Sequence, residues 1–393
     1  MKKDYFVTWT SQKDAIQIPV LETTEQYYLL NDGSPLYDLS SCSYHQSFGL
    51  KNKFIQDAIK NQIDELPLLG PKFSFPLKDK VSKNLLAKLK LSGKIFYTTS
   101  GSESVENALK VARDKTGKDY ILRRENSYHG ATLGSLSVTG DWRSQNMTSL
   151  SDLSISIPEP FEKDALKNTE KTIKDNLDKG IAALIVETIT GGNGVIVPSK
   201  EWFLGIEKLC KQYDILLILD EVVCGFARTG KDFGFHHYGI SPNIICLSKA
   251  ISGGFIPFGA VYCDDSISSF YEDHKLKCGL TNYAHPLGLR ALDAILDTLD
   301  STQFKTNLEN RIKVLDSFLN KVNTLEKVKE TRSIGLLAAV EFHENKTPSF
   351  KELIEKGIFI NIIGNNMIFA PFLIGEVDIL ESTLNELLNH LNI

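Results

Sequence analysis

Between residues 94 and 280, short apolar runs alternate with amphipathic segments of about 10 to 15 residues. This alternation is typical of crossover units, in which a helix connects two parallel strands of one sheet. The segment 215–219 is the clearest strand, because it is apolar at every position, as a strand covered on both faces should be. We therefore predict an α/β fold with a mostly parallel, doubly wound sheet, whose other strands are expected at 95–98, 120–122, 182–187, 244–247 and 260–262.

The chain on either side of this alternation has a different pattern. After Pro286, a long helical stretch runs to about residue 323, and a strand is expected at 336–342. Near the other end, 27–30 and 36–39 flank an Asn-Asp-Gly-Ser turn and resemble a β-hairpin. These segments indicate a second, smaller α+β unit.

The length of the chain also favours two domains. A single hydrophobic core rarely grows past about 250 to 300 residues, and this chain has 393. We expect a large domain at 51–285 and a smaller domain built from 1–50 and 286–393.

Composition excludes several classes of function. The 44 basic and 49 acidic residues are spread along the chain, which gives neither the basic surface of a nucleic-acid binder nor an acidic tail. The six cysteines lack the close pairing of a zinc or redox site, so we expect reduced thiols and no metal. No apolar stretch approaches the roughly 18 residues that cross a bilayer. A cytoplasmic protein that acts on small molecules, without nucleic-acid or membrane partners, is expected.

Polar residues directly after the expected strands are the candidates for a functional site, because ligands of open α/β sheets bind beyond the carboxyl ends of the strands. One such place is Thr99-Ser-Gly-Ser, which opens an amphipathic helix. Exposed amides and the positive end of the helix dipole can hold a phosphate there, with the Ser102 hydroxyl as an extra donor. The alternative is an ordinary capping box formed by Ser100 and Glu103.

Three further residues follow apolar runs. Asp220 stands at the mouth of a buried strand, where a carboxylate needs a partner such as a protonated ring nitrogen, or a salt bridge as the plainer alternative. Lys249 follows another strand, and burial can lower its pKa as imine chemistry requires, although most lysines are solvated surface groups. Tyr128 can stack on a planar ligand, or can be a simple turn aromatic. Together these features are those of a pyridoxal-phosphate site.

The sequence resembles the class III (ω-amino group) aminotransferases of fold type I over nearly the whole chain. The motifs that carry the resemblance are Thr99-Ser-Gly-Ser-Glu-Ser-Val-Glu106, Ser127-Tyr-His-Gly-Ala-Thr132, the region of Glu187, Asp220-Glu-Val-Val-Cys-Gly-Phe-Ala-Arg-Thr-Gly230, Leu247-Ser-Lys-Ala-Ile-Ser-Gly-Gly254 and Thr281-Asn-Tyr-Ala-His-Pro286. Jointly these motifs are highly specific.

The resemblance implies a role for each matching residue. Lys249 would carry pyridoxal 5'-phosphate as an imine and Asp220 would pair with its ring nitrogen, so that these two are the expected catalytic residues. The other expected cofactor contacts are Gly101 and Ser102 at the phosphate, Val222 and Tyr128 on the two ring faces, Glu187 near cofactor and substrate, and Thr281 at the phosphate of the neighbouring subunit. A homodimer with shared active sites is implied, while Arg228 and Arg332 match recurring arginines of unassigned role.

Some positions depart from the family pattern. Many members carry an arginine that clamps a substrate carboxylate just before a C-terminal Ala-Pro-Pro-Leu-like segment, and Ile368 stands there in this chain. His285 and Leu50 also differ from the more usual asparagine and histidine. The missing arginine favours a neutral amine, a diamine or an ω-amino acid over a simple α-amino acid as amino donor. The early aromatics Trp9, Tyr44, Phe73 and Phe75 are candidates either for the pocket lining or for plain packing.

The activity implied is a transamination in two halves. An amine displaces Lys249, the freed lysine moves a proton, and a keto acid or aldehyde collects the amino group by the reverse path, in the ping-pong pattern of covalent catalysis. An aminomutase or racemase on the same scaffold is the nearest alternative. A catalytically silent cofactor-binding homologue is a further one, although the lysine and aspartate set is complete.

Overall fold

The structure is a computed structural model that describes residues 4–147 and 151–392. Its centre is a seven-stranded sheet with the order β4-β10-β9-β8-β7-β5-β6. The strands of this sheet are β4 (Lys94–Thr98), β5 (Tyr120–Arg124), β6 (Ser154–Ile157), β7 (Ile181–Glu187), β8 (Leu216–Asp220), β9 (Ile244–Leu247) and β10 (Gly259–Cys263).

The direction of the strands confirms the expected mostly parallel sheet. Strands β6, β5, β7, β8 and β9 are parallel, whereas β10 is antiparallel to both of its neighbours, β4 and β9. All six strands expected from the alternation are present, with bounds that agree within two residues. The strand β6 was not expected from the sequence.

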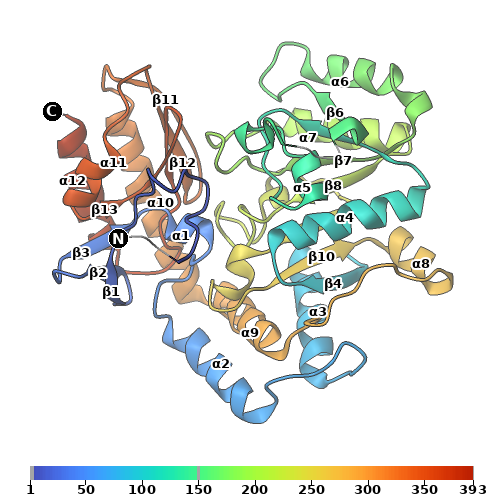
Figure 1. The fold of residues 1–393 in the computed structure, drawn as a ribbon, viewed down its shortest axis with the longest axis horizontal. Coiled ribbons are helices and arrows are strands. Elements are labelled where there is room, and N and C mark those ends of the chain that lie inside the picture. The colour runs from blue at the N-terminus through green and yellow to red at the C-terminus, as the bar shows by residue number, and fades with distance from the viewer. Residues whose placement is uncertain (1–3, 148–150, 393) are drawn as a thin grey trace.

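Helices cover both faces of this sheet, which explains why its inner strands are continuously apolar (Figure 1). One face packs on α4 (Gly101–Thr116), whose Val105 and Leu109 share a core with Ile218 of β8. The other face belongs to the main core, where Trp202 of α7 (Lys200–Gln212) and Leu217 of β8 are buried. Further helices around the sheet are α5 (Leu133–Ser137), α6 (Ala165–Lys174) and α8 (Asp265–Asp273).

Two smaller sheets stand in the other lobe, on the left of Figure 1. The first has the order β1-β2-β3-β13, and the second has the order β11-β12-β15-β14. Their strands are β1 (Val20–Thr23), β2 (Tyr27–Leu30), β3 (Pro35–Asp38), β11 (Val328–Ile334), β12 (Leu337–Phe342), β13 (Ile358–Phe359), β14 (Asn361–Ile363) and β15 (Asn366–Phe369). The expected hairpin is confirmed, because β2 and β3 pair antiparallel. On its other edge, β3 pairs in parallel with β13 from near the opposite end of the chain.

The expected helical stretch after Pro286 is confirmed, and it is divided into two helices at Ser301. The backbone of Ser301 is extended, with φ −64° and ψ 128°, and its side chain caps the second helix by accepting a hydrogen bond from the Phe304 amide at 3.4 Å. The remaining helices are α1 (Ser41–Tyr44), α2 (Lys53–Glu65), α3 (Pro76–Leu89), α9 (Pro286–Asp300), α10 (Thr302–Val322), α11 (Phe350–Glu355) and α12 (Val377–Leu391). Of the helices formed by residues 4–147 and 151–392, none combines the length and the apolar composition that a membrane crossing requires.

Candidate active site

One cavity of about 410 Å³ collects nearly all of the residues singled out in the sequence. It lies at the carboxyl ends of β7, β8 and β9, where the first residues of α4 also begin. The expected site residues that line it are Gly101, Ser102, Tyr128, Glu187, Asp220, Val222 and Lys249. Thr281 is exposed and does not line this cavity.

Lys249 follows β9 after one intervening residue, Ser248. Its backbone has a left-handed φ of 49°, and the Ser248 hydroxyl fixes the turn by donating to the Phe258 carbonyl at 2.9 Å. Burial lowers the pKa of the Lys249 amine from 10.5 to about 8, against the opposite pull of the carboxylates Asp220 and Glu187. About a tenth of the amine is therefore neutral and nucleophilic at pH 7, far more than for a lysine of ordinary pKa.

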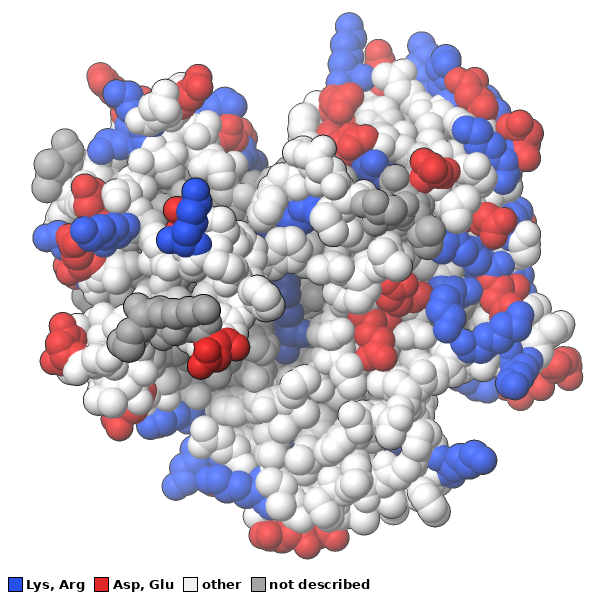
Figure 2. All heavy atoms as spheres, in the orientation of Figure 1, with Lys and Arg blue, Asp and Glu red and all other residues white. Residues whose placement is uncertain are grey.

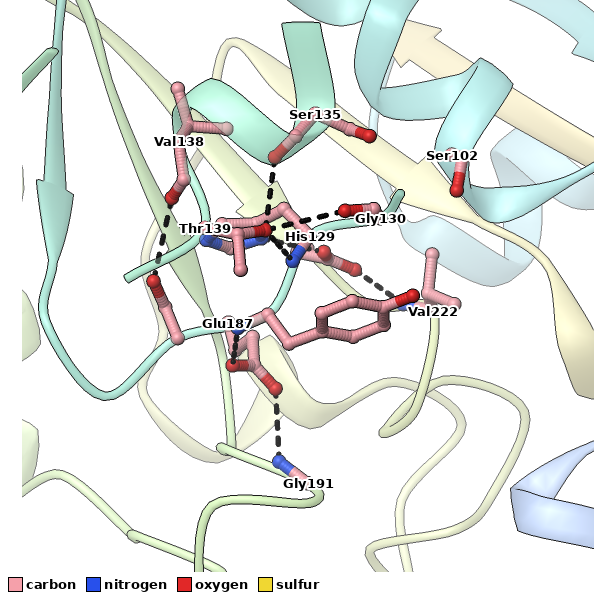
Figure 3. A network of polar contacts seen from close by, with 12 residues as sticks. Ser102, His129, Gly130, Ser135, Val138, Thr139, Glu187, Gly191 and Val222 are labelled. Carbon is pink, nitrogen blue, oxygen red and sulfur yellow. Dashed lines mark hydrogen bonds and ion pairs between the residues drawn. The ribbon is translucent and has the colours of Figure 1, made fainter. Parts of the chain in front are cut away.

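Asp220 ends β8 and is buried, with 5% of its surface exposed. One carboxylate oxygen accepts the Val222 amide at 3.0 Å, and the other lies 2.8 Å from Nδ1 of His129. The His129 amide in turn donates to the Thr139 hydroxyl at 3.0 Å (Figure 3). The second ring nitrogen of His129, Nε2, is buried without a hydrogen-bond partner among the described residues.

His129 is a site residue that the sequence reasoning missed. It stands inside the Ser-Tyr-His-Gly motif, but its pairing with Asp220 joins residues 91 positions apart. An imidazole here orients the carboxylate and leaves it facing the cavity. The only sequence feature that pointed to His129 as a site residue was its position next to Tyr128.

Glu187 ties together two loops that border the cavity. Its carboxylate accepts the amide of Tyr128 at 3.1 Å and the amide of Gly191 at 2.9 Å, as Figure 3 shows. Burial raises the pKa of Glu187, while electrostatic interactions with His129 and Arg124 oppose that rise. Because both hydrogen bonds end on backbone amides, Glu187 fixes where the Tyr128 ring stands.

The N-terminus of α4 also borders the cavity. Ser100 caps the helix by accepting the Glu103 amide at 3.2 Å, but the reciprocal bond of the expected capping box, from the Ser100 amide to Glu103, is absent among the described residues. Glu103 itself accepts the amide and the hydroxyl of Thr99, both at 2.7 Å. Within the described residues, these bonds leave the amides of Gly101 and Ser102 as the unpaired donors of the first turn, which suits an anion.

Close packing explains two small residues at this wall. A Cβ at Gly101 would lie 3.0 Å from the Val222 side chain, and a Cβ at Gly130 would lie 2.5 Å from the Ser102 hydroxyl oxygen. Gly130 also has a left-handed φ of 136°. The Ser102 hydroxyl accepts the Ala131 amide at 3.3 Å, which holds this loop against the helix.

The opposite side of the cavity is built from distant parts of the chain. Trp9 and Tyr44 line it, whereas the other early aromatics, Phe73 and Phe75, do not. Arg143, which the sequence reasoning did not single out, also lines it. Its guanidinium carbon lies 4.3 Å from the centre of the Tyr128 ring.

The segment that carries Tyr44 to the cavity has an unusual backbone conformation. The four residues Ser41, Cys42, Ser43 and Tyr44 all have left-handed φ values between 46° and 75°, so that α1 is a left-handed turn rather than an α-helix. Such conformations cost roughly 1 to 2 kcal/mol per residue without glycine. Buried Asp38 holds the turn by accepting the Ser40 and Cys42 amides, each at 2.6 Å. The Tyr44 ring lies 4.7 Å from the Lys249 amine.

Three other residues from the sequence analysis have positions outside the cavity. Ile368 is fully buried on β15 opposite Ala339, and the nearby C-terminal residues that line the cavity are Asn361 and Ile363. Arg228 is fully buried and donates to the carbonyls of Leu336 and Pro371 and to the Ser47 hydroxyl. Arg332 bonds the Gly194 carbonyl and Asn366. Both arginines therefore connect loops.

The arrangement suits one kind of ligand. A neutral amine at Lys249 can bond an aldehyde, the Asp220 carboxylate can hold a protonated ring nitrogen, and the amides at the start of α4 can hold a phosphate. Val222 and Tyr128 border the same space, where a flat ring would fit between them. The donor set therefore agrees with the cofactor that the resemblance implies.

Comparisons with known proteins identify relatives over almost the entire chain. A family model described as aminotransferase class-III matches residues 8–391. A [LysW]-aminoadipate semialdehyde/glutamate semialdehyde transaminase of Sulfurisphaera tokodaii is 30% identical over 373 residues, covering 90% of this chain and 91% of that protein. An acetylornithine aminotransferase of Methanocaldococcus jannaschii is 30% identical over 346 residues, covering 85% and 83%.

Solved structures agree with these matches. The taurine:2-oxoglutarate aminotransferase from Bifidobacterium kashiwanohense, in complex with PLP and glutamate, has a TM-score of 0.92 and 29% identity, covering 98% of this chain and 95% of that one. An S-selective transaminase from Arthrobacter sp. with alanine bound has a TM-score of 0.89 and 26% identity, covering 99% and 96%.

Proposed function

Because the chain belongs to the class III aminotransferases of fold type I, which use pyridoxal phosphate, we propose that Lys249 and Asp220 are its catalytic residues. The enzyme moves an amino group from an amine or ω-amino acid to a keto acid or aldehyde. One observation supports these roles above all others. Lys249, whose pKa is lowered to about 8, and the buried Asp220 line the same cavity as the first turn of α4.

Each residue has a defined task in this proposal. When bound, pyridoxal phosphate supplies an electron sink for the charge that develops at the substrate carbon. Lys249 would hold the cofactor through its Nζ, and once an amine has taken its place the free Nζ would take the proton from the substrate carbon. Asp220, held by His129 and the Val222 amide, would keep a proton on the ring nitrogen of the cofactor.

The remaining cofactor contacts follow from the walls of the cavity. Gly101 and Ser102 would hold the phosphate, while Val222 and Tyr128, which line the same cavity, would pack on the two faces of the ring. Glu187 positions Tyr128 through the backbone amide. Thr281 is assigned to the phosphate of the neighbouring subunit, in keeping with its exposure away from its own cavity.

A homodimer is part of the proposal. In Figure 2, few charged side chains lie over the segment that joins α2 and α3, although charged side chains border it at the lower left and along the bottom edge. Exposed large apolar residues gather along these segments, namely Phe54, Ile63, Leu68 and Phe73. A broad apolar area of this kind suits a permanent contact with a second copy. A mass of twice 43.9 kDa in sedimentation is expected, and a stable monomer would contradict it.

The cellular compartment and the division of the chain also belong to the proposal. All six cysteines are free, which suits the reducing cytoplasm. The large domain is placed at 51–285 and the smaller domain at 1–50 and 286–393. The position of β3 beside β13 supports joining the two chain ends in one domain.

The test is the absorption spectrum of the protein loaded with pyridoxal phosphate, followed while single amino donors are added without an acceptor. Conversion of the bound cofactor to its aminated form by amines or ω-amino acids is expected. Lys249→Ala should abolish turnover and still bind the cofactor without a covalent bond. Near-normal turnover in this variant would disprove the role of Lys249. A cofactor band that no donor converts would favour the aminomutase or racemase alternative.

A further inference from the structure

The left-handed turn Ser41–Tyr44 is strained, although it carries a residue of the cavity. None of its four residues is a glycine, and the left-handed conformation is unfavourable for every residue that has a Cβ. The turn ends at Tyr44, whose ring is 6% exposed and lies 4.7 Å from the Lys249 amine. Strain of this kind persists only where the surrounding groups hold the backbone in place. The groups that bond the turn therefore decide where the Tyr44 ring stands.

Asp38 is aimed at the strained backbone. It is the last residue of β3 and is only 1% exposed. Its Oδ1 atom accepts the Ser40 amide and its Oδ2 atom accepts the Cys42 amide, each at 2.6 Å. Hydrogen bonds to a charged acceptor are about twice as strong as those between neutral groups. One ionised carboxylate thus holds the residue before the turn and the second residue within it.

Two neutral bonds act at the ends of the same turn. The Ser41 hydroxyl donates to the Ala370 carbonyl at 2.6 Å, and the Ser47 hydroxyl donates to the Tyr44 carbonyl at 2.8 Å. These bonds attach the ends of the turn to their surroundings, but neither acts on the Cys42 amide. The carboxylate of Asp38 is therefore the group that fixes the middle of the turn.

The charge of Asp38 costs the folded protein free energy. Burial raises the pKa of the Asp38 carboxyl to about 6, although the amides of the turn and the opposite charge of Arg228 oppose that rise. An unfolded aspartate ionises near pH 4. The raised pKa therefore contributes stability at low pH, and this contribution is lost as the pH rises from about 4 through about 6. At pH 7 the ionised carboxylate does not serve overall stability, which indicates a more local task.

We propose that Asp38 is a positioning residue, which holds the left-handed turn so that the Tyr44 ring covers the Lys249 amine and excludes water from it. Lys249 follows β9 of the large sheet, whereas Asp38 lies on β3, which pairs with β13 in one of the smaller sheets. The smaller sheet thus controls the environment of a residue on the larger one. This inference rests on the proposed function, because it concerns the amine that would bond the cofactor.

The alternative is that Asp38 acts on Lys249 through its negative charge alone. The direction of the change in the Lys249 pKa separates the two roles. Loss of a negative charge lowers the pKa of an amine, whereas entry of water around a buried amine raises it. Burial is the main cause of the low pKa of Lys249, and the carboxylates Asp220 and Glu187 oppose it. A higher pKa after neutralisation of Asp38 can therefore come only from lost burial.

The test measures the titration of Lys249 in the full-length protein freed of cofactor. Acetic anhydride acetylates only neutral amines, and mass spectrometry follows the rate at Lys249 as a function of pH. The half-maximal rate should lie near pH 8 in the wild type. In Asp38→Asn, an amide N–H group faces one of the two backbone amides, so the turn should relax and the midpoint should rise by about one pH unit. Asp38→Ser, which can accept only one amide, is the second variant and should also raise the midpoint.

Glycine at position 43 tests whether the effect passes through the turn. Ser43 has a φ of 57°, and Ser43→Gly removes the Cβ penalty of that conformation. Added to Asp38→Asn, Ser43→Gly should return the midpoint toward pH 8, whereas Ser43→Ala should leave it high. The matched control is Asp264→Asn, because Asp264 also accepts a backbone amide, that of Ile267 at 2.9 Å, at the start of α8. This control should leave the midpoint of Lys249 unchanged.

Two outcomes would overturn the inference. The first is an unchanged or lower midpoint in the Asp38 variants, which should fold because they remove a buried charge, as urea unfolding checks. The second is a rise that glycine at position 43 does not reverse, since the turn would then not be the link. Acetylation reports on Lys249 whether or not the protein transfers amino groups. If no amino donor converts the bound cofactor, the proposed function fails, and the acetylation midpoints still decide the role of Asp38.

Discussion

The two sides of the cavity are built in opposite ways. On the sheet side, Asp220, Glu187 and Ser102 follow strands or open a helix, and each is fixed by hydrogen bonds to the backbone. On the far side, the Tyr44 hydroxyl has no hydrogen-bond partner in the described part of the chain, and Arg143 packs among aromatic rings and pairs with Asp141. The side chains of Asp220, Glu187 and Ser102 are thus held in place before a ligand arrives, whereas the Tyr44 hydroxyl on the far side still has its hydrogen bond to make. This difference suits a permanent cofactor on one side and an exchanging substrate on the other.

Removal of the buried carboxylate from the sheet side should give the largest effect on rate. Asp220→Asn keeps the shape and one acceptor but loses the negative charge beside His129 and the ring nitrogen. Turnover in the half-reaction should fall on the order of 10²- to 10³-fold, the usual loss when one electrostatic partner of a transition state is removed. Stopped-flow absorbance measures it. The rates with 4-aminobutanoate and with butylamine should fall by similar factors, because this change lies on the cofactor side. A loss that affects only one of the two donors would contradict the assignment of cofactor and substrate to opposite sides of the cavity.

The pKa of Lys249 predicts a pH dependence of cofactor binding, and this effect is expected to be intermediate in size. The neutral amine attacks the aldehyde, and a pKa of about 8 means that its fraction grows about tenfold per pH unit below that value and levels off above it. The rate at which the protein without cofactor takes up pyridoxal phosphate should therefore rise with pH, reach half of its maximum near pH 8 and level off at about pH 9. A rate that keeps rising toward pH 10 would indicate a lysine of ordinary pKa.

The variant Tyr44→Ala measures how much of the lowering of the Lys249 pKa is due to burial by the far side of the cavity. Burial is the main cause of the lowered pKa, and the Tyr44 ring lies 4.7 Å from the amine. Opening this side to water should move the plateau to higher pH. If the pH at which the uptake rate levels off is unchanged in Tyr44→Ala, the burial that lowers the Lys249 pKa is due entirely to the sheet side.

The smallest effect concerns the strained turn that carries Tyr44. Ser43 is exposed and has a left-handed φ of 57°. Ser43→Gly should stabilise the protein by about 1 kcal/mol, because glycine adopts this conformation without the Cβ penalty. The midpoint of urea unfolding measures the change. Ser43→Ala is the control, since it removes the hydroxyl but keeps the Cβ, and a gain as large as that of glycine would refute backbone strain as the cause.

The sequence predicted the sheet side well for physical reasons. Strands covered on both faces, such as β7 and β8, are continuously apolar, so their ends are visible in the sequence. Since ligands bind beyond these ends, the positions of Asp220 and Lys249 followed directly. The pairing of His129 with Asp220 was missed because it joins residues far apart in the chain.

The far side was harder to predict because no periodic pattern marks it. Arg143 lies in a short turn between longer elements, and an arginine in a loop is usually solvated. The left-handed turn at Ser41–Tyr44 contains no glycine that would announce it. The break between α9 and α10 was missed for a similar reason, since a serine within an apolar helical pattern does not require a new helix.

The two sides of the cavity are completed at different times during synthesis of the chain. It combines Trp9, Tyr44 and Arg143 with Asn361 and Ile363, whereas the sheet side needs only residues up to Lys249. On the ribosome, the residues of the cofactor side have all been made while more than a hundred remain, and the substrate side cannot close until Ile363 has emerged. A nascent chain can therefore hold all of its cofactor-binding groups well before it can select a substrate.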